Sequence, residues 1–176
     1  LKRPPVLPMA LLTFEERGAG AKDLGPKAVD LLFAKLAVRP DVYLVDRADL
    51  KKEIEEQSLS LTGAVKPEEA VKVGQLTGAK LIVTGSVVQV EKKLYLVAKV
   101  ISTETGRVAG ASAEGTLTDD LGQLAGKLAD AIDDTLTKQG EKLIPKPVPL
   151  VDKVAALNKK LGKGTRPVVA IQVTEK

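Results

Sequence analysis

The stretch from Lys80 to Gly115 constrains the fold most, because it predicts three β-strands joined by two tight turns. Its residues are mostly β-branched, aliphatic or small, which suits a pleated sheet with a packed face. The predicted turns lie at 91–93 and 104–106. No pair of side chains in this stretch could act as a nucleophile and its base. These residues therefore indicate a scaffold rather than a reaction.

The middle strand of this stretch carries apolar side chains on both of its faces. One face carries four of them: Leu94, Leu96, Ala98 and Val100. The other face carries three, together with one lysine: Tyr95, Val97, Lys99 and Ile101. A strand with water on one side would alternate between apolar and polar residues, so this pattern predicts a central strand covered on both sides.

Two short apolar runs, 9–14 and 42–45, predict further strands. A glycine-rich loop is expected over 15–21. Near the other end of the chain, 166–173 is again apolar and predicts a last strand. The strands are separated along the chain by stretches with a different period, which are typical of helices.

Apolar residues at helical spacing predict a first helix that begins at Asp23, whose side chain can cap it, with Pro26 in the first turn. A second helix is expected over roughly 48–57, with Leu50 and Ile54 facing inward.

A third helix is predicted to open at Pro67 and to end at Gly78 in a left-handed cap, with Val73 and Leu76 pointing inward.

The longest helix is predicted from 118 to Gly140. Its apolar residues form one continuous stripe: Leu121, Leu124, Leu128, Ala131, Ile132 and Leu136. Packing in a core is the commoner use of such a stripe, and docking of a partner protein is the alternative.

Together these elements predict an α/β fold. We expect a mixed, mostly antiparallel-edged sheet of about five strands, packed with helices on both faces. This domain is expected over 1–143. The remainder, 144–176, reads as a proline-rich linker followed by a helix–strand extension. Its strand either returns to the sheet or begins a second domain that is missing here.

The composition excludes several kinds of chemistry. The chain has no histidine and no cysteine, which removes Ser-His-Asp catalysis, thiolate catalysis and the usual zinc sites. Only four aromatic rings are present, which argues against base stacking on single-stranded nucleic acid: Phe14, Phe33, Tyr43 and Tyr95. The net charge of +4 is spread among interspersed acids, as on a solvated surface. We therefore expect no enzyme, no cofactor, no metal and no nucleic-acid partner.

Membrane contact is expected only through an anchor. No apolar run approaches the roughly 18 residues of a membrane-spanning helix. The chain begins at Leu1 rather than at methionine, so a signal peptide or a lipid-bearing cysteine could precede it.

The segment Gly18-Ala-Gly20 is the first candidate site, because backbone amides there could hold an anion with help from Lys22. Neither the phosphate-loop pattern nor the dinucleotide pattern is met, because Asp23 stands where a third glycine belongs. A plain flexible loop is the favoured interpretation.

Two charged clusters are the other candidates. Four acids are expected at the carboxyl ends of strands, where they could bind a divalent cation: Glu15, Glu16, Asp46 and Asp49. Four basic residues near the end of the chain could contact phosphate or acidic lipid: Lys159, Lys160, Lys163 and Arg166. For the acids, the favoured interpretation is that Asp49 caps a helix and the two glutamates are solvated. For the basic residues, it is a cationic C-terminal end of a helix.

Several short motifs follow one another in an order that resembles a known family. They are Val-Asp-Arg-Ala-Asp-Leu at 45–50, Leu-Ser-Leu-Thr-Gly at 59–63, Thr-Gly-Ser at 84–86 and Thr-Glu-Thr-Gly at 103–106. An early strand that closes on Phe14-Glu-Glu-Arg-Gly precedes them. Over about residues 6–140 this order resembles the CsgG-like family, the curli production and transport component.

The resemblance implies an α/β domain that faces the periplasm of a diderm envelope. It also implies a non-enzymatic role in assembly or secretion, often with ring-forming self-association, and it offers no catalytic residues. The curli channel proper has two long hairpins that line its pore, whereas here Val90 passes to Leu94 through three residues. A soluble domain without its own pore is therefore expected.

Three hypotheses follow. The leading one is a binding and assembly protein in curli-type secretion or surface assembly, with other envelope proteins as partners. Relatives of the family include TolB amino-terminal-like domains and peptidoglycan-synthase activator lipoproteins, so the alternative is an activator that docks on such a synthase. The third is an enzyme that uses Glu15, Glu16 and Asp46 with a divalent metal.

Overall fold

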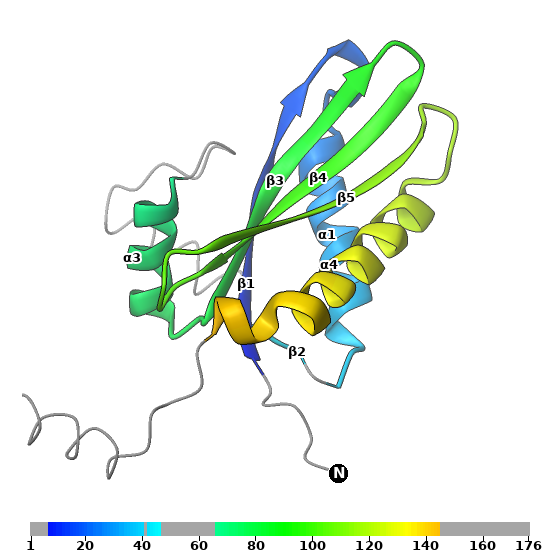
Figure 1. Ribbon diagram of the computed structural model, residues 1–176. Helices are drawn as coiled ribbons and strands as arrows, with labels where there is room; N and C mark the ends of the chain where they lie inside the picture. The colour runs from blue at the N-terminus through cyan, green and yellow to red at the C-terminus, as the bar shows by residue number, and fades with distance from the viewer. Residues whose placement is uncertain (1–6, 41, 47–65, 145–176) are drawn as a thin grey trace, which may run out of the picture. The chain divides into compact units, whose positions relative to one another are not determined.

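The computed structural model describes residues 7–40, 42–46 and 66–144 (Figure 1). They belong to the first of two compact units, Leu1–Pro145, and the second unit is Lys146–Lys176. The predicted helix over 48–57, the linker beyond Ile144, the C-terminal helix and strand, and the basic cluster lie outside the described residues.

A five-stranded sheet forms the centre of the domain, in the order β2-β1-β3-β4-β5. Its strands are β1 (Leu7–Arg17), β2 (Val42–Leu44), β3 (Leu81–Val90), β4 (Lys93–Ser102) and β5 (Val108–Thr116). The pairs β1–β2 and β1–β3 are parallel, and β3–β4 and β4–β5 are antiparallel. The predicted α/β class, the mixed sheet of five strands and the three-stranded meander are confirmed.

Helices pack on both faces of this sheet (Figure 1). The helices α1 (Leu24–Ala37) and α4 (Leu121–Leu143) share one core with alternate residues of the strands. The helix α3 (Pro67–Thr77) packs with strand residues of the opposite alternation and forms a second, smaller core. Because successive strand residues point to opposite faces, the two cores lie on opposite sides of the sheet.

The apolar stripe of α4 lies in the larger core, as the favoured interpretation predicted. Leu124, Leu128 and Ile132 are buried against β4, β5 and α1. The helix begins at Asp120, whose side chain accepts a hydrogen bond from the Gln123 amide at 3.0 Å. The buried members of the stripe are therefore part of the core of the fold.

The prediction for β4 is only half correct. Its first face, from Leu94 to Val100, is buried beneath α1 and α4. On its second face only Ile101 is buried in the core with α3, while Tyr95 and Val97 are half-buried and Lys99 is exposed. The short α3 covers one end of the second face, so the other end has no described helix over it.

The prediction for α3 is also partly wrong. Gly78 adopts the expected left-handed cap with φ of 72°, and Val73 is buried. Leu76 is 43% exposed rather than inward. The cause is the close approach at Gly74, where a Cβ atom would lie 2.0 Å from the Thr103 Cγ2 atom. This contact turns Val73 and Gly74 toward the sheet and Leu76 away from it.

Thr84 in β3 is fully buried, and its hydroxyl has no hydrogen-bond partner among the described residues. Replacing it with the isosteric valine removes this unsatisfied group, so Thr84→Val is expected to raise the free energy of unfolding by about 1 kcal/mol. Urea denaturation measures this change. The matched control is Thr135→Val, because the Thr135 hydroxyl donates to the Ala131 carbonyl at 2.8 Å. That variant should lose stability, and a loss in both variants would contradict the prediction.

Candidate protein-binding surface

The glycine loop at 18–20 is occupied by the protein's own groups. The Gly20 amide donates to Oε1 of Gln89 in β3, and the Ala21 amide donates to the Gly18 carbonyl at 3.1 Å. A Cβ atom at either glycine would lie 2.8 Å from an atom of Gln89. The glycines therefore allow the loop to pack on Gln89, and the amides at Gly20 and Ala21 are not directed at an anion.

The amides at the start of α1 are satisfied by Glu16, not by Asp23. The Glu16 carboxylate accepts hydrogen bonds from the Asp23 amide at 3.0 Å and the Gly25 amide at 2.9 Å. Asp23 adopts a left-handed conformation with φ of 60° and makes no side-chain cap, so the predicted cap is wrong. The expected loop at 15–21 is also wrong in its first part, because β1 continues to Arg17 and pairs with β3.

Removing this cap should destabilise the domain. Glu16→Ala leaves the two amides without their acceptor, and we expect the free energy of unfolding to fall by about 1 kcal/mol. The control is Glu15→Ala, because Glu15 makes only an exposed pair with Arg17 at 2.8 Å and such pairs contribute little. Equal urea midpoints for the two variants would contradict the assigned role of Glu16.

The acidic residues proposed as a cation site do not come together. Asp46 follows Leu44 by two residues, and Leu44 pairs with Met9, whereas Glu15 and Glu16 lie six and seven residues beyond Met9 in β1. Asp46 and the glutamates are therefore offset by at least four positions, roughly 13 Å along the strand at about 3.3 Å per residue. Asp49 lies outside the described residues. Within 7–40, 42–46 and 66–144, no group of three or more His, Cys, Asp or Glu could hold a metal ion.

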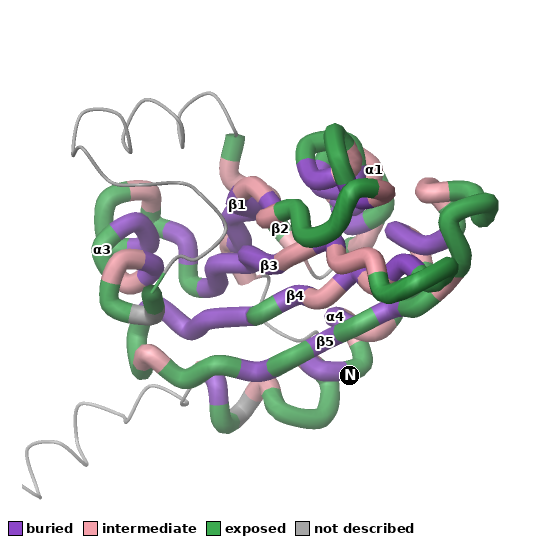
Figure 2. The backbone as a smooth tube through the Cα atoms, turned by 90° about the horizontal axis from the view of Figure 1, so that it is seen from above, coloured by how far each residue is buried: buried purple, intermediate pink, exposed green. Residues whose placement is uncertain are grey.

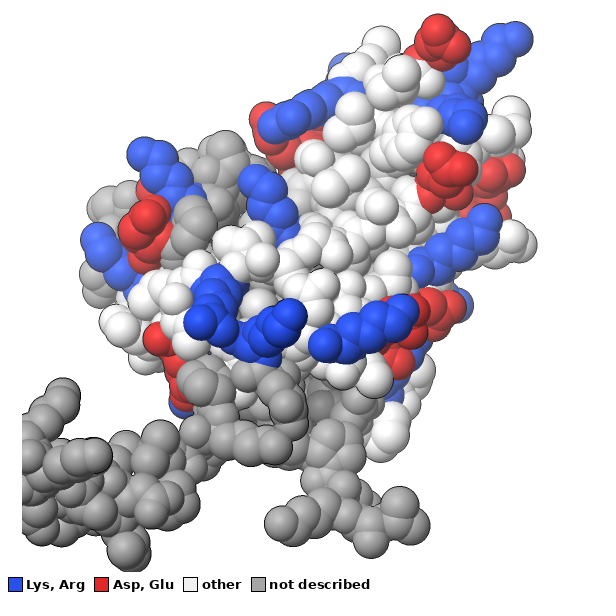
Figure 3. All heavy atoms as spheres, viewed as in Figure 1, with Lys and Arg blue, Asp and Glu red and all other residues white. Residues whose placement is uncertain are grey.

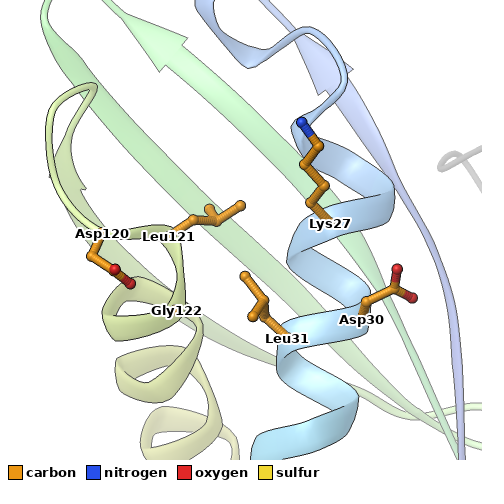
Figure 4. A pocket seen from close by; sticks show the side chains of 6 residues that line it. All are labelled: Lys27, Asp30, Leu31, Asp120, Leu121 and Gly122. Carbon is orange, nitrogen blue, oxygen red and sulfur yellow. The ribbon is translucent and has the colours of Figure 1, made fainter.

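One shallow groove lies between the first turn of α4 and α1 (Figure 4). It encloses about 470 Å³ and is lined by six residues: Lys27, Asp30, Leu31, Asp120, Leu121 and Gly122. Figure 4 shows Leu31 and Leu121 projecting into the space between the helices. The Asp120 carboxylate at its margin accepts a hydrogen bond from the Gln123 amide, as the cap of α4.

The junction between β5 and α4 is held by Asp119. Its carboxylate accepts a hydrogen bond from the Thr116 amide at 2.8 Å. The backbone and side-chain hydrogen bonds from Thr116 hold the pKa of Asp119 below its ordinary 3.8, with a smaller contribution from Lys127.

Because the pKa is lowered in the folded state, these hydrogen bonds contribute fully to the free energy of unfolding above about pH 3.8. Their contribution is lost as the pH falls through the lowered pKa. Asp119→Asn cannot titrate, so its unfolding midpoint in urea should depend less on acid below pH 3.8. Parallel acid titrations of the two proteins would contradict this assignment.

Part of the second face of the sheet has no described helix packed on it. We call it the open face and define it by five residues of β3 and β4: Val88, Val90, Tyr95, Val97 and Lys99. Val90 is 53% exposed. In Figure 3, which views this side of the molecule, the surface over the strands is largely uncharged and most charged side chains lie near its margins.

The strand β5 continues the open face to the margin of the sheet. Figure 2 shows its residues alternating between buried and exposed. Ala109, Ala111 and Ala113 point into the core, and the exposed positions of β5 belong to five residues: Val108, Gly110, Ser112, Glu114 and Thr116. Apart from Lys99 and Glu114, the side chains of this surface are apolar, small or hydroxyl-bearing, as is common where proteins contact one another.

Sequence reasoning missed this surface, although one signal was present. Lys99 interrupts the second apolar face of β4, and a charge at that position is compatible with solvent but not with a helix packed above it.

Comparison with known proteins agrees with the motif order. The family described as "Curli production assembly/transport component CsgG" matches residues 13–121. The chain belongs to the CsgG family. The match contains the last part of β1, from Thr13 to Arg17, together with α1, β2, α3 and all three strands of the meander. It therefore includes the open face, and it ends where α4 begins.

Solved structures share the fold of this family member. The LpoB C-terminal domain from Salmonella enterica is 15% identical with a TM-score of 0.56, covering 65% of this chain and 86% of that chain. The same domain from Escherichia coli is 15% identical with a TM-score of 0.55, covering 66% and 87%. TolB from Acinetobacter baumannii is 12% identical with a TM-score of 0.52, covering 78% and 29%. No curated protein matches the chain.

None of the helices described in the structure is long and apolar enough to cross a membrane.

Proposed function

We propose that this chain is a non-enzymatic binding and assembly domain of the cell envelope, acting in curli-type secretion or surface assembly without a pore of its own. The observation that carries the proposal is the CsgG family match over residues 13–121, whose description names curli assembly and transport. The open face lies within those residues and supplies a surface for protein contacts.

The chemistry of the open face supports binding over catalysis. Its side chains are aliphatic, apart from Tyr95 and Lys99. Burial of apolar area is the main source of affinity between proteins, and aromatic residues are enriched where that area is largest. The nearby acids on this side are engaged, since Glu114 lies 3.9 Å from Lys93 and Glu15 lies 2.8 Å from Arg17.

Two measurements in the native host test the proposal. Fractionation of cells that express the tagged full-length protein should place it in the envelope. A photo-crosslinking amino acid at Val97 should then join it to another envelope protein, whereas the same amino acid at Lys138, on the exposed side of α4, should not.

The outcomes separate the hypotheses. A component of a secretion or surface-assembly system as the crosslinked protein supports the proposed role. A peptidoglycan synthase supports the activator alternative, which would require that adding the protein changes the rate of that synthase. A protein found only in the cytosol, or equal crosslinking from Val97 and Lys138, would contradict an envelope role for the open face.

A further inference from the structure

The two edges of the sheet differ in how they are protected. The edge strand β2 has only three residues and follows Pro40. The edge strand β5 has nine residues and pairs with β4 without a bulge. It contains no proline and no lysine, and its one charged residue is Glu114. Natural sheets usually protect a long edge with such devices, because an open edge accepts another strand.

The backbone of β5 presents an alternating row of free groups. The Ser102 amide donates to the Arg107 carbonyl at 2.9 Å, which sets the hydrogen-bonded pairs of the β4–β5 ladder. In an antiparallel ladder these pairs alternate, so Ala109, Ala111 and Ala113 bond to β4. The intervening residues Val108, Gly110, Ser112 and Glu114 direct their amides and carbonyls to the outer edge, whereas the amide of Thr116 is taken by the Asp119 carboxylate.

A lysine of β4 lies opposite the middle of this edge strand. Lys99 pairs across the ladder with Gly110, and a Cβ atom at Gly110 would meet nothing within 4 Å. Lys99 is exposed and has no ion-pair partner in the described structure, whereas Lys93 on the same strand pairs with Glu114. An acidic side chain on a neighbouring strand opposite Gly110 would lie about 10 Å from the Lys99 backbone, within the combined reach of both side chains.

The position of α4 decides which kind of strand can fit. The Thr135 hydroxyl donates to the Gly110 carbonyl at 3.3 Å, so α4 lies beneath the outer edge of β5. A second copy of this chain, paired edge to edge, would bring its own α4 to the same place. Packed helices need 8–10 Å between their axes, whereas neighbouring strands are about 4.8 Å apart. A single extended segment has no helix of its own to place there.

We propose that β5 accepts an extended segment of a partner protein as a sixth strand, with an acidic side chain opposite Gly110 that pairs with Lys99. This inference rests on the proposed binding function and names how the partner is held. Backbone hydrogen bonds would supply affinity and Lys99 would select the register. The Gly110 carbonyl retains a second lone pair, so its bond to Thr135 does not block the ladder.

The test uses two short synthetic peptides that alternate threonine and valine, one with a central glutamate and one with a central lysine. Added at millimolar concentration to the isotope-labelled full chain, the glutamate peptide should shift the amide signals of Val108, Gly110, Ser112 and Glu114. We expect it to bind about threefold more tightly than the lysine peptide. Lys99→Glu should reverse that preference.

A matched pair of variants tests the backbone ladder. Ser112→Pro removes an outward amide at an edge position where proline is tolerated. It should lower the affinity for the glutamate peptide about tenfold or more. Ser112→Ala keeps the amide and should bind like wild type. The amide spectrum of each variant checks its fold, and the Lys99→Glu result stands independently if the proline variant does not fold.

Absence of β5 amide shifts with the glutamate peptide would overturn the inference, as would equal binding by the two Ser112 variants. The proposed function is tested separately by crosslinking from Val97. If that crosslink persists in the Ser112→Pro protein, the open face binds its partner without strand addition, and only the inference fails.

Discussion

Replacing Gly85 with alanine is expected to lower the free energy of unfolding by about 3 kcal/mol. Gly85 pairs with Ala98 in the middle of the β3–β4 ladder. A Cβ atom at Gly85 would lie 2.0 Å from the Val97 carbonyl oxygen and 3.0 Å from its carbon. These are backbone atoms of a neighbouring strand, so no side-chain rotation can relieve the contact and the two strands must separate locally.

Gly110→Ala is the matched control for Gly85→Ala, because its added Cβ atom would meet nothing within 4 Å. It should stay within about 0.5 kcal/mol of wild type. Urea denaturation monitored by circular dichroism measures both proteins. Similar midpoints for the two alanine variants would show that β3 and β4 are not as closely apposed as the structure describes.

Leu128→Ala is expected to cost about 3 kcal/mol of stability. Leu128 is fully buried in the larger core, where α4 packs on the sheet and on α1. Truncation removes apolar contacts and leaves a cavity that the surrounding strands cannot fill without breaking their ladder. The same denaturation measurement applies, and loss of the cooperative transition would be the extreme form of the expected result.

Leu76→Ala provides the contrast for Leu128, since Leu76 is a leucine of α3 that is 43% exposed. It is expected to change stability by less than about 0.5 kcal/mol. A cost comparable to that of Leu128→Ala would mean that the sequence-based placement of Leu76 on the inner face was correct after all.

Local patterns in the sequence were sufficient for much of the fold. The alternation from Leu94 to Val100, the two turns of the meander and the apolar stripe of α4 each specify their element through nearest neighbours along the chain. The left-handed cap at Gly78 is equally local, because only its own backbone conformation is involved. From these features the α/β class and the sheet of about five strands could be predicted, and the structure confirms both.

The errors came from contacts that depend on how the elements fold back on one another. Glu16 replaces Asp23 as the group that satisfies the start of α1, across a turn of seven to nine residues, and this requires β1 to end beside that helix. The glycines at 18 and 20 are explained by Gln89, about 70 residues away. No periodicity records either contact. The idea of a cation site failed for a related reason, because strands of unequal length end at different levels of the sheet.

The open face could not be predicted, because the apolar pattern of β4 is ambiguous. Apolar residues on both faces of β4 indicate burial but do not say what covers each face or how far the cover extends. Among the described elements, the length and position of α3 limit that cover to the end near Ile101. The lysine at position 99 was the one local sign of solvent on that face.

The connectivity of the sheet has a kinetic consequence. The three strands from Leu81 to Thr116 are contiguous in the chain, so their pairing closes only short loops, whereas β1 must find β3 across the whole intervening segment. Loop-closure entropy makes such distant pairing slow. We therefore expect the meander to be structured in the folding transition state and β1 to join late. Substitutions in the meander should then slow refolding, whereas substitutions in β1 should mainly accelerate unfolding.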